Sequence, residues 1–359
     1  MRVLHMIPDI GISNGIMSVI INYAKAMPEN IKFDVVYFHE CENTKQSEIE
    51  ALGGRVFKIN PPSPKNAVKR DMDKFFSQHK GEWDVLHINA PHFAVFIAPA
   101  ARRAGINKIC VHCHSSQFSL NPKNEKRNEL FTKAGLRFTD KKFACGIDAG
   151  RFWFGNDDAF TVLKNAIDCE KYAFSEKIRT EKRDELDLAD KIVITHIGKT
   201  DITQKNHPFI LRVFSKIYEK NCNSVLMLIG AVPTEELDAL AGELGISDAI
   251  LYLGVRNDVN ELLQAGDVFL FPSIQEGLPM SVIEAQAAGL PTFISDAITN
   301  EVIATDLVKV LSLNSSPDIW AKEILETDLS SRRITTDQMQ QSGWEITNTS
   351  QTLVDYYEA

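Results

Sequence analysis

The segment VFLFPSIQEGLPMSVIEAQAAGLPTFIS, residues 268–295, decides the fold of this chain, because it joins two short apolar runs through a loop and a helix. Short runs rich in Val, Ile and Phe are typical of strands buried in a parallel sheet. Pro279 suits the first turn of a helix and Gly289 suits its end, so we predict a helix over about 279–288. The segment therefore predicts a complete βαβ unit.

Two carboxylates lie in this otherwise apolar segment, Glu276 on the predicted loop and Glu284 inside the predicted helix. The start of a helix carries free N–H groups and partial positive charge, which suit a phosphate. Carboxylates nearby can accept hydrogen bonds from the vicinal hydroxyls of a sugar or a ribose, so the segment suits a nucleotide sugar. The alternative is that Glu276 only complements the helix dipole and Glu284 is a surface charge. Spacing does not decide between the two.

The same alternation of strand and helix extends over nearly the whole chain, which at 359 residues is too long for one ordinary core. The pattern resets after a polar stretch near 168–190, so we predict two doubly wound α/β domains of the Rossmann-like type, facing an interdomain cleft. Their expected bounds are 1–168 and 169–335. Helices are expected near 16–27, 46–52, 65–79, 93–104, 125–137, 148–154, 207–220, 234–244, 257–265 and 279–288.

The composition is typical of a soluble globular protein, with 44% hydrophobic and 24% charged residues. No apolar run approaches the roughly 20 residues of a membrane-spanning helix. The first residues, MRVLHMIPDIG, lack the features of a signal peptide, and six cysteines are scattered along the chain. We therefore expect a cytoplasmic protein with reduced thiols.

The net charge of −9 hides a basic stretch, residues 102–142, which holds ten Lys and Arg against three Asp and Glu. A basic patch on an acidic protein can mean an anionic partner, such as a membrane surface, a phosphate or nucleic acid. The alternative, an ordinary solvated face, is the interpretation that we favour from the sequence alone. We hypothesise that this stretch docks on the inner leaflet of a membrane, near a lipid-diphosphate acceptor.

Polar residues at strand ends are the next candidates, because ligands of doubly wound sheets bind beyond the carboxyl ends of the strands. Lys199 follows a strand and Lys205 follows it after a short polar loop, so two ammonium groups there could hold a pyrophosphate. A P-loop would need a glycine where Val193 stands, which argues against an NTPase. His114 also falls at a strand end, where it either serves a ligand or caps local backbone.

Two motifs typical of haem or metal sites occur in the wrong context. The run CVHCH, residues 110–114, continues a strand, and residues i and i+3 of a strand point to opposite faces. Asp71 and Asp73 lie in a charged helical stretch, where residues i and i+2 do not share a face. We therefore expect neither a metal nor a cofactor.

These residues together resemble glycosyltransferase family 4, retaining enzymes of the GT-B fold, and within it the branch that builds bacterial capsular polysaccharides and exopolysaccharides. The run HIGKTDITQKNHPFILRVF, residues 196–214, is similar to the family's basic loop and helix, and residues 251–302 are similar to its nucleotide-sugar segment. The run VLKNAID, residues 162–168, resembles the family's domain junction. By analogy, a last helix over about 336–359 would cross back onto the first domain.

The resemblance implies a role for each candidate residue. Glu276 would bind hydroxyls of the donor sugar, and Glu284 the hydroxyls of the ribose. Lys199 and Lys205 would hold the pyrophosphate, and His114 would contact the sugar and position the acceptor. Catalysis would rest on His114, Glu276 and Lys205. The remaining donor contacts would come from Gly15, Val255, Arg256, Gly277, Leu278, Met280 and Ser281.

The chain departs from the family pattern at three positions. Lys199 stands where the family usually has an arginine, and it keeps the charge but loses the bidentate fork. Asn14 and Ala166 stand where the family usually has glycines. The first two departures touch the expected phosphate site, so they bear on donor affinity or turnover.

The expected function is retaining, metal-independent transfer of a sugar from a nucleotide sugar, with a UDP-sugar as the expected donor. The expected acceptor is a glycan or a lipid-diphosphate-linked saccharide in bacterial surface polysaccharide biosynthesis, and nucleic acid is not an expected partner. Two alternatives stay open. One is a nucleotide-sugar 2-epimerase of the same fold, and the other is a catalytically silent partner that binds nucleotide sugars.

Overall fold

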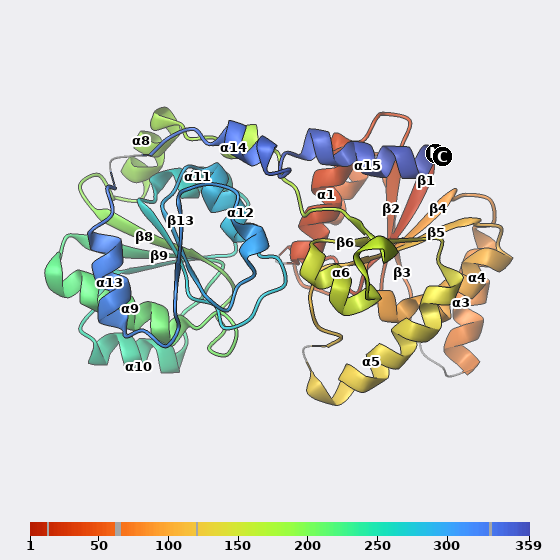
Figure 1. Ribbon diagram of the computed structural model, residues 1–359, viewed down its shortest axis with the longest axis horizontal. Coiled ribbons are helices and arrows are strands. Elements are labelled where there is room, and N and C mark those ends of the chain that lie inside the picture. The colour runs from red at the N-terminus through yellow and green to blue at the C-terminus, as the bar shows by residue number, and fades with distance from the viewer. Residues whose placement is uncertain (13, 62–65, 120, 330–331) are drawn as a thin grey trace. The chain divides into compact units, whose positions relative to one another are not determined.

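The computed structural model describes residues 1–12, 14–61, 66–119, 121–329 and 332–359. The chain forms two compact units, each built around one parallel sheet (Figure 1). The first unit comprises Met1–Ala166 and Ile346–Ala359, and the second comprises Ile167–Glu345. The chain therefore leaves the first unit once and returns to it near its end.

In the described part of the chain, the first unit carries a seven-stranded parallel sheet in the order β3-β2-β1-β4-β5-β6-β7. Because strand order runs in opposite directions on the two sides of β1 and β4, the switch point lies between these two strands. The strands are β1 (Arg2–Met6), β2 (Lys32–Tyr37), β3 (Val56–Lys58), β4 (Val85–Ile88), β5 (Lys108–Cys113), β6 (Lys141–Ala144) and β7 (Thr161–Val162).

Two helices of the first unit, α1 and α5, start at asparagines whose side chains cap them. The Asn14 side chain accepts hydrogen bonds from the N–H groups of the first turn of α1, and Asn121 caps α5 in the same way. The helices are α1 (Gly15–Ala26), α2 (Gln46–Ala51), α3 (Asn66–Gln78), α4 (Ala94–Arg103), α5 (Pro122–Gly135), α6 (Ile147–Phe154) and α15 (Ile346–Glu358), with 3-10 turns η1 (Pro91–Phe93), η2 (Leu136–Phe138) and η3 (Asp157–Ala159).

The described part of the second unit carries a six-stranded parallel sheet in the order β10-β9-β8-β11-β12-β13. Its switch point lies between β8 and β11, again because strand order reverses there. The strands are β8 (Ile192–Ile197), β9 (Ser224–Ile229), β10 (Ile250–Gly254), β11 (Val268–Phe271), β12 (Thr292–Ser295) and β13 (Val308–Leu311).

The helices of the second unit connect these strands and complete its layers. They are α7 (Cys169–Tyr172), α8 (Glu176–Glu185), α9 (His207–Lys220), α10 (Glu235–Glu243), α11 (Val259–Ala265), α12 (Met280–Ala287), α13 (Pro317–Leu325) and α14 (Thr336–Gln341), with 3-10 turns η4 (Ser247–Ala249) and η5 (Asn300–Val302). None of the helices in the described ranges combines the length and the hydropathy that crossing a bilayer requires.

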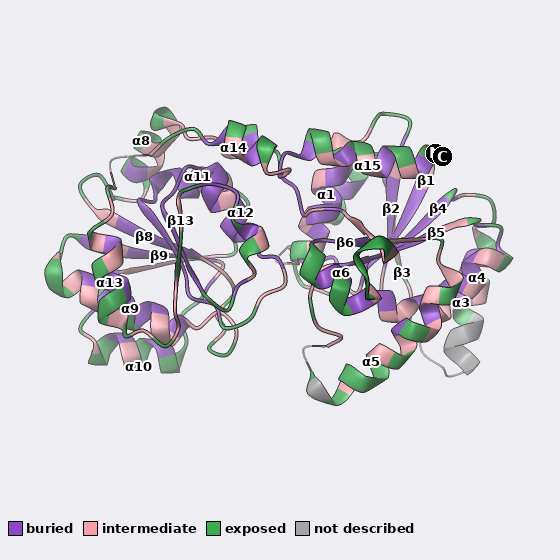
Figure 2. Ribbon diagram, in the orientation of Figure 1, coloured by how far each residue is buried: buried purple, intermediate pink, exposed green. Residues whose placement is uncertain are grey.

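The central strands of each sheet are buried on both faces, as Figure 2 shows in purple. Every residue of β4, β11 and β12 is buried, whereas the edge strands β10 and β13 are only partly covered. Burying a Val, Leu, Ile or Phe side chain completely contributes about 1.5–3 kcal/mol. The free energy that holds each sheet in place therefore comes mainly from the centre, where the two switch points lie.

The predicted helices agree with the structure except near the ends of the second unit. Two helices, α7 and α8, form in the stretch that we treated as a polar connection, and α13 was not predicted. The single helix expected over 336–359 is wrong: α14 and α15 are separate helices, because Gly343 has a φ of 72° between them. The predicted helix over 65–79 is α3 from residue 66 on, and residue 65 lies outside the described residues.

Candidate active site

The switch point of the second unit brings together two loops that carry candidate residues. The loop after β8, residues 198–206, carries Lys199 and Lys205. The loop after β11, residues 272–279, carries Glu276 and leads into α12. Because both loops leave the carboxyl ends of adjacent strands, they lie where ligands of this kind of sheet bind.

Lys205 and Glu276 form an ion pair across these two loops. The distance from Lys205 Nζ to Glu276 Oε1 is 2.7 Å, and the two side chains are 19% and 9% exposed. Lys205 Nζ also lies 4.8 Å from the centre of the Phe271 ring, a cation–π contact. Gln204 Nε2 donates to Glu276 Oε2 at 3.4 Å. The structure therefore holds an ammonium group and a carboxylate side by side at the strand ends.

The two loops are tied by hydrogen bonds that position this pair. Asn206 adopts a left-handed backbone conformation with a φ of 62°, and its side chain donates to the Pro272 carbonyl at 3.2 Å. The Ile274 N–H donates to the Gln204 carbonyl at 2.8 Å. Asparagine tolerates this backbone region better than most residues, which explains its place immediately before α9.

Gly198 has no side chain, which leaves room for the side chain of Lys205. A Cβ atom at this position would lie 3.2 Å from Lys205 Cδ and 3.0 Å from His196 Nε2. A side chain here would therefore press on the lysine of the ion pair. Lys199, by contrast, is exposed, and in the described part of the chain it forms no ion pair. The structure thus brings Lys205, but not Lys199, into contact with Glu276.

Helix α12 starts beside this pair, at Met280 instead of the expected 279. Its N-cap residue, Pro279, provides no side-chain hydrogen bond, and the first turn contains no acidic residue. The first N–H groups of a helix have no partner within the helix, so Met280 and Ser281 present donors at this end. Leu278 is 7% exposed and packs into the unit, which anchors the loop before the helix.

Glu284 is held by a residue that the sequence did not reveal. The hydroxyl of Tyr172, on α7, donates to Glu284 Oε1 at 3.0 Å. Burial and the neighbouring carboxylate raise the pKa of Tyr172 well above its usual value, so the hydroxyl keeps its proton. Glu284 is half-buried, and the interpretation of it as a simple surface charge is wrong.

Val255 and Arg256 follow β10, two strands away from β8 in the sheet. The Val255 side chain is 53% exposed. The Arg256 guanidinium makes two hydrogen bonds of 2.8 and 2.7 Å to the Asp258 carboxylate, which also bonds to Lys182 at 2.9 Å. These cations hold the pKa of Asp258 well below its usual value. Arg256 is therefore fixed by its neighbours and is not in contact with Glu276.

In the first unit, His114 lies just beyond β5 and is half-buried. Its Nε2 atom lies 3.1 Å from Asn89 Oδ1, and its Nδ1 atom lies 3.3 Å from Asn165 Oδ1. Burial lowers the pKa of His114 to about 4, against the opposing hydrogen bond to Asn165. The ring is therefore neutral near pH 7, and it bonds to two asparagine side chains instead of capping backbone.

Gly15 is the first residue of α1, at the carboxyl end of β1. A Cβ atom here would meet no heavy atom within 4 Å. Asn14 accepts hydrogen bonds from the Ile16 and Met17 N–H groups, so this departure from the family pattern serves as a helix cap. Among the described residues, the packing around position 15 leaves room for a side chain.

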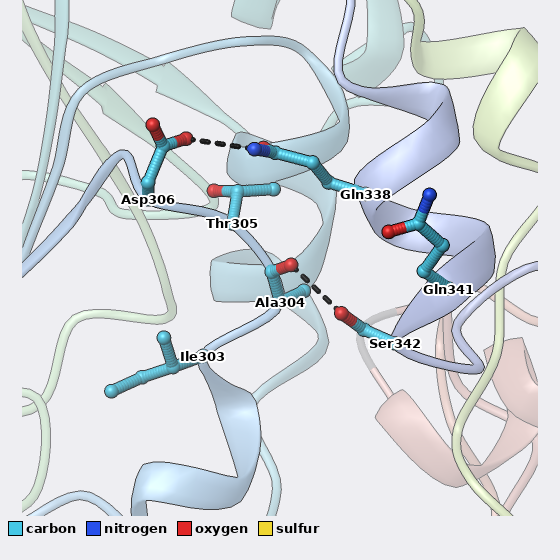
Figure 3. A pocket seen from close by; sticks show the side chains of 7 residues that line it. All are labelled: Ile303, Ala304, Thr305, Asp306, Gln338, Gln341 and Ser342. Atoms are coloured by element: carbon cyan, nitrogen blue, oxygen red, sulfur yellow. Dashed lines mark hydrogen bonds between the residues drawn. The ribbon is translucent and has the colours of Figure 1, made fainter.

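A pocket in the second unit lies between the segment after η5 and α14 (Figure 3). Gln338 donates to Asp306 across it, and Ser342 donates to the Ala304 carbonyl. Its lining contains none of the candidate site residues. The lining residues are Ile303, Ala304, Thr305, Asp306, Gln338, Gln341 and Ser342.

Comparison with solved structures defines the fold. The Anabaena protein HepE, solved in complex with UDP and glucose, superimposes with a TM-score of 0.81 at 17% sequence identity, over 100% of both chains. WaaG, described as a glycosyltransferase involved in lipopolysaccharide biosynthesis, superimposes with a TM-score of 0.63 at 14% sequence identity, over 99% of this chain and 97% of its own. The present fold, with two Rossmann-like units, is the GT-B fold.

Sequence relatives then give the family. The model of the family described as "Glycosyl transferases group 1" matches residues 191–327. A putative glycosyltransferase of Bacillus subtilis, EpsF, is 31% identical over 336 residues, which are 90% of this chain and 86% of that protein. An Escherichia coli enzyme named UDP-Gal:alpha-D-GlcNAc-diphosphoundecaprenol alpha-1,3-galactosyltransferase is 26% identical over 65% of this chain and 64% of its own. This chain belongs to the glycosyltransferase group 1 family, and it is a glycosyltransferase.

Proposed function

We propose that this enzyme is a family 4 glycosyltransferase that transfers a sugar from a UDP-sugar to a lipid-diphosphate-linked saccharide in surface polysaccharide assembly. The observation that carries the proposal is the pair Lys205–Glu276 at the β8–β11 switch point, beside the start of α12. The printed name of the Escherichia coli relative supports both substrates, since it specifies a UDP-sugar donor and a diphosphoundecaprenol-linked acceptor for that enzyme.

Each group at the switch point has a task in this proposal. Glu276 accepts hydrogen bonds from hydroxyls of the donor sugar, while Lys205, its ion-pair partner, faces the diphosphate. Glu284, oriented by Tyr172, accepts hydrogen bonds from the ribose. Lys199, which is exposed, binds the diphosphate as a second cation. The N–H groups at the start of α12 complete the anion site.

The proposed reaction proceeds with retention and without a metal. The bond between the anomeric carbon and the diphosphate oxygen breaks, and the acceptor oxygen bonds to the same face of the anomeric carbon. The acceptor's proton passes to the departing phosphate oxygen. Lys205 and the α12 N-terminus supply positive charge where negative charge develops, which is electrostatic stabilisation of the transition state.

A membrane contact is part of the proposal because of the exposed face of α5. Five side chains on this face recur at intervals of three or four residues, which places them on one side of a helix. All five are exposed: Lys123, Lys126, Arg127, Leu130 and Lys133. The one apolar residue among them, Leu130, is 65% exposed. Each basic residue near an anionic surface contributes about 1 kcal/mol.

The full chain should bind vesicles rich in phosphatidylglycerol at low salt but not neutral vesicles. Equal binding to both, or to neither, would remove this contact from the proposal.

The test of the function has two steps. A thermal-shift screen of UDP-, GDP- and ADP-sugars identifies the donor, and UDP release is then followed with and without a short-chain lipid-diphosphate saccharide. The proposal predicts stabilisation by a UDP-sugar and UDP release that depends on the acceptor. Conversion of UDP-GlcNAc to UDP-ManNAc without any acceptor would establish an epimerase instead. Donor binding with no acceptor-dependent release would show a silent binding protein.

A further inference from the structure

Asn89, just beyond β4, has an amide whose orientation is determined by its neighbours. The amide nitrogen Nδ2 lies 3.2 Å from the Met6 carbonyl and 3.4 Å from the His87 carbonyl. Only the NH2 end of the amide can donate to carbonyl oxygens. The other end, Oδ1, is therefore the atom that faces His114 Nε2 at 3.1 Å.

This orientation determines which ring nitrogen of His114 carries a proton. Because Asn89 Oδ1 can only accept, the hydrogen bond requires an N–H at His114 Nε2. Asn89 is 4% exposed, and a turned amide would place its oxygen against two carbonyl oxygens, where no hydrogen bond can form. The surroundings of Asn89 thus select one tautomer of the histidine.

The second ring nitrogen, Nδ1, carries a lone pair when the ring is neutral. In the described part of the chain, three further buried histidines surround His114: His5 on β1, His87 on β4 and His112 on β5. A positive charge on His114 would lower the pKa of each of them. The centre of the His112 ring lies 4.0 Å from that of His114. A neutral ring with a proton on Nε2 has only a lone pair at Nδ1, and Asn165 Oδ1, which lies 3.3 Å from it, can only accept. The Asn165 amide must therefore rotate by 180° so that its NH2 group donates to Nδ1.

We propose that Asn89 is a positioning residue that holds His114 as the neutral Nε2–H tautomer, so that Nδ1 serves as a hydrogen-bond acceptor for a substrate hydroxyl. A hydroxyl that reaches Nδ1 takes the place of the Asn165 amide, which makes a single bond of 3.3 Å to the ring. In this account His114 orients a hydroxyl and does not deliver a proton. The inference rests on the proposed function and on the contact between His114 and the sugar that the family resemblance implies.

The tautomer can be measured without knowing the substrates. The full chain is labelled with 15N at its histidine rings, and two-bond correlation spectra identify protonated and unprotonated ring nitrogens. His114→Gln assigns the His114 signals by their loss. We expect a protonated Nε2 and an unprotonated Nδ1, unchanged from pH 8 to pH 5. An N–H at Nδ1, or titration of the ring near pH 6.5, would overturn the proposal.

Two variants test the role of Asn89 with a matched control. Asn89→Ala removes the acceptor, so the single tautomer should become a mixture and acceptor-dependent UDP release should fall by tenfold or more. Asn89→Asp keeps an acceptor and adds negative charge, so the Nε2–H should persist and the pKa of His114 should rise above its value in the wild type. The control, Asn165→Ala, should leave the Nε2–H tautomer in place. A single tautomer in Asn89→Ala would contradict the proposal.

The wild-type spectrum remains decisive if the first unit of Asn89→Ala does not fold. The signals of His87 and His112, which are buried in that unit, would report such unfolding. The failure of the inference and that of the proposed function give different results. An Nδ1–H tautomer together with an inactive His114→Gln variant would refute the positioning role of Asn89 and keep the function. Normal transfer by His114→Gln would remove His114 from the function, whatever its tautomer.

Discussion

Single residues at the strand ends carry the chemistry that we propose, and their charges are visible in the sequence. Glu276, Lys205 and His114 were selected because each follows an apolar run at the point where a strand ends. Their partners were not visible. Glu276 pairs with a lysine 71 positions away, and neither interpretation of its spacing included that pair. Asn165 and Tyr172 lie 51 and 112 positions from the residues they contact, and only the folded sheet brings them together.

Gly15 offers a prediction at this scale, because the packing of the chain leaves its Cβ position open. Gly15→Ala should keep stability within about 1 kcal/mol of the wild type, since alanine favours a helix and meets no neighbour. If the donor phosphates approach this backbone, acceptor-dependent UDP release should fall by tenfold or more. Gly242→Ala, at an exposed position of α10, is the matched control and should leave turnover unchanged. Wild-type turnover of Gly15→Ala would show that no ligand approaches there.

The helices and strands followed from local patterns where each pattern was long and periodic. Helix α9 has the predicted bounds, 207–220, because its apolar positions recur every three or four residues. Helices α7 and α8 were missed because their sequence is almost wholly polar, and tertiary contacts stabilise them. Arg179 and Arg183, both on α8, bond to Asp267, which is 5% exposed. Such long-range ion pairs leave no trace in local periodicity.

The end of α12 gives a prediction at the scale of the element. Gly289 has a φ of 69°, and a Cβ atom there would lie 2.0 Å from the Arg333 carbonyl oxygen. Gly289→Ala should therefore cost about 3 kcal/mol or more, because both the backbone conformation and the close contact oppose a side chain. Urea unfolding of the variant beside Gly242→Ala measures this loss. A midpoint within error of the control would contradict the described helix end.

At the scale of the whole molecule, buried histidines make the protein sensitive to acid. Burial lowers the pKa of His5 to about 3 and that of His114 to about 4, and it lowers the pKa values of His87, His112 and His196 well below the usual value of 6.5. Below pH 6.5 the unfolded chain takes up protons that the folded chain cannot bind. Stability should therefore fall as pH drops from about 6.5 toward 4.

This acid sensitivity is large enough to measure. Each buried histidine contributes a slope of about 1.4 kcal/mol per pH unit in that window, and ordinary carboxylates titrate mainly below it. Urea unfolding at pH 7.5, 6.5 and 5.5, followed by tryptophan fluorescence, should show a smaller loss of stability between the first two and a steeper loss at the third. Equal midpoints at pH 7.5 and 5.5 would mean that these rings are not buried and neutral.

The fold class could be predicted because the alternation of strands and helices extends over nearly the whole chain. Its interruption near residues 168–190 indicated two domains. The GT-B fold and the glycosyltransferase class are confirmed by the structure and its relatives. The retaining chemistry, the donor and the roles of the site residues stay predictions, because they depend on which atoms meet a bound substrate.

Turnover of variants of the Lys205–Glu276 pair tests the account most directly. Acceptor-dependent UDP release is measured for the wild type, Lys205→Ala, Glu276→Gln, the double variant and a surface control, Lys216→Ala, whose partner is Glu219. Each single variant should lose about 100-fold or more with an unchanged fold, and the double variant should lose little more, because the two side chains act together. Turnover near the wild-type value in either single variant would contradict the claim that this pair holds the donor.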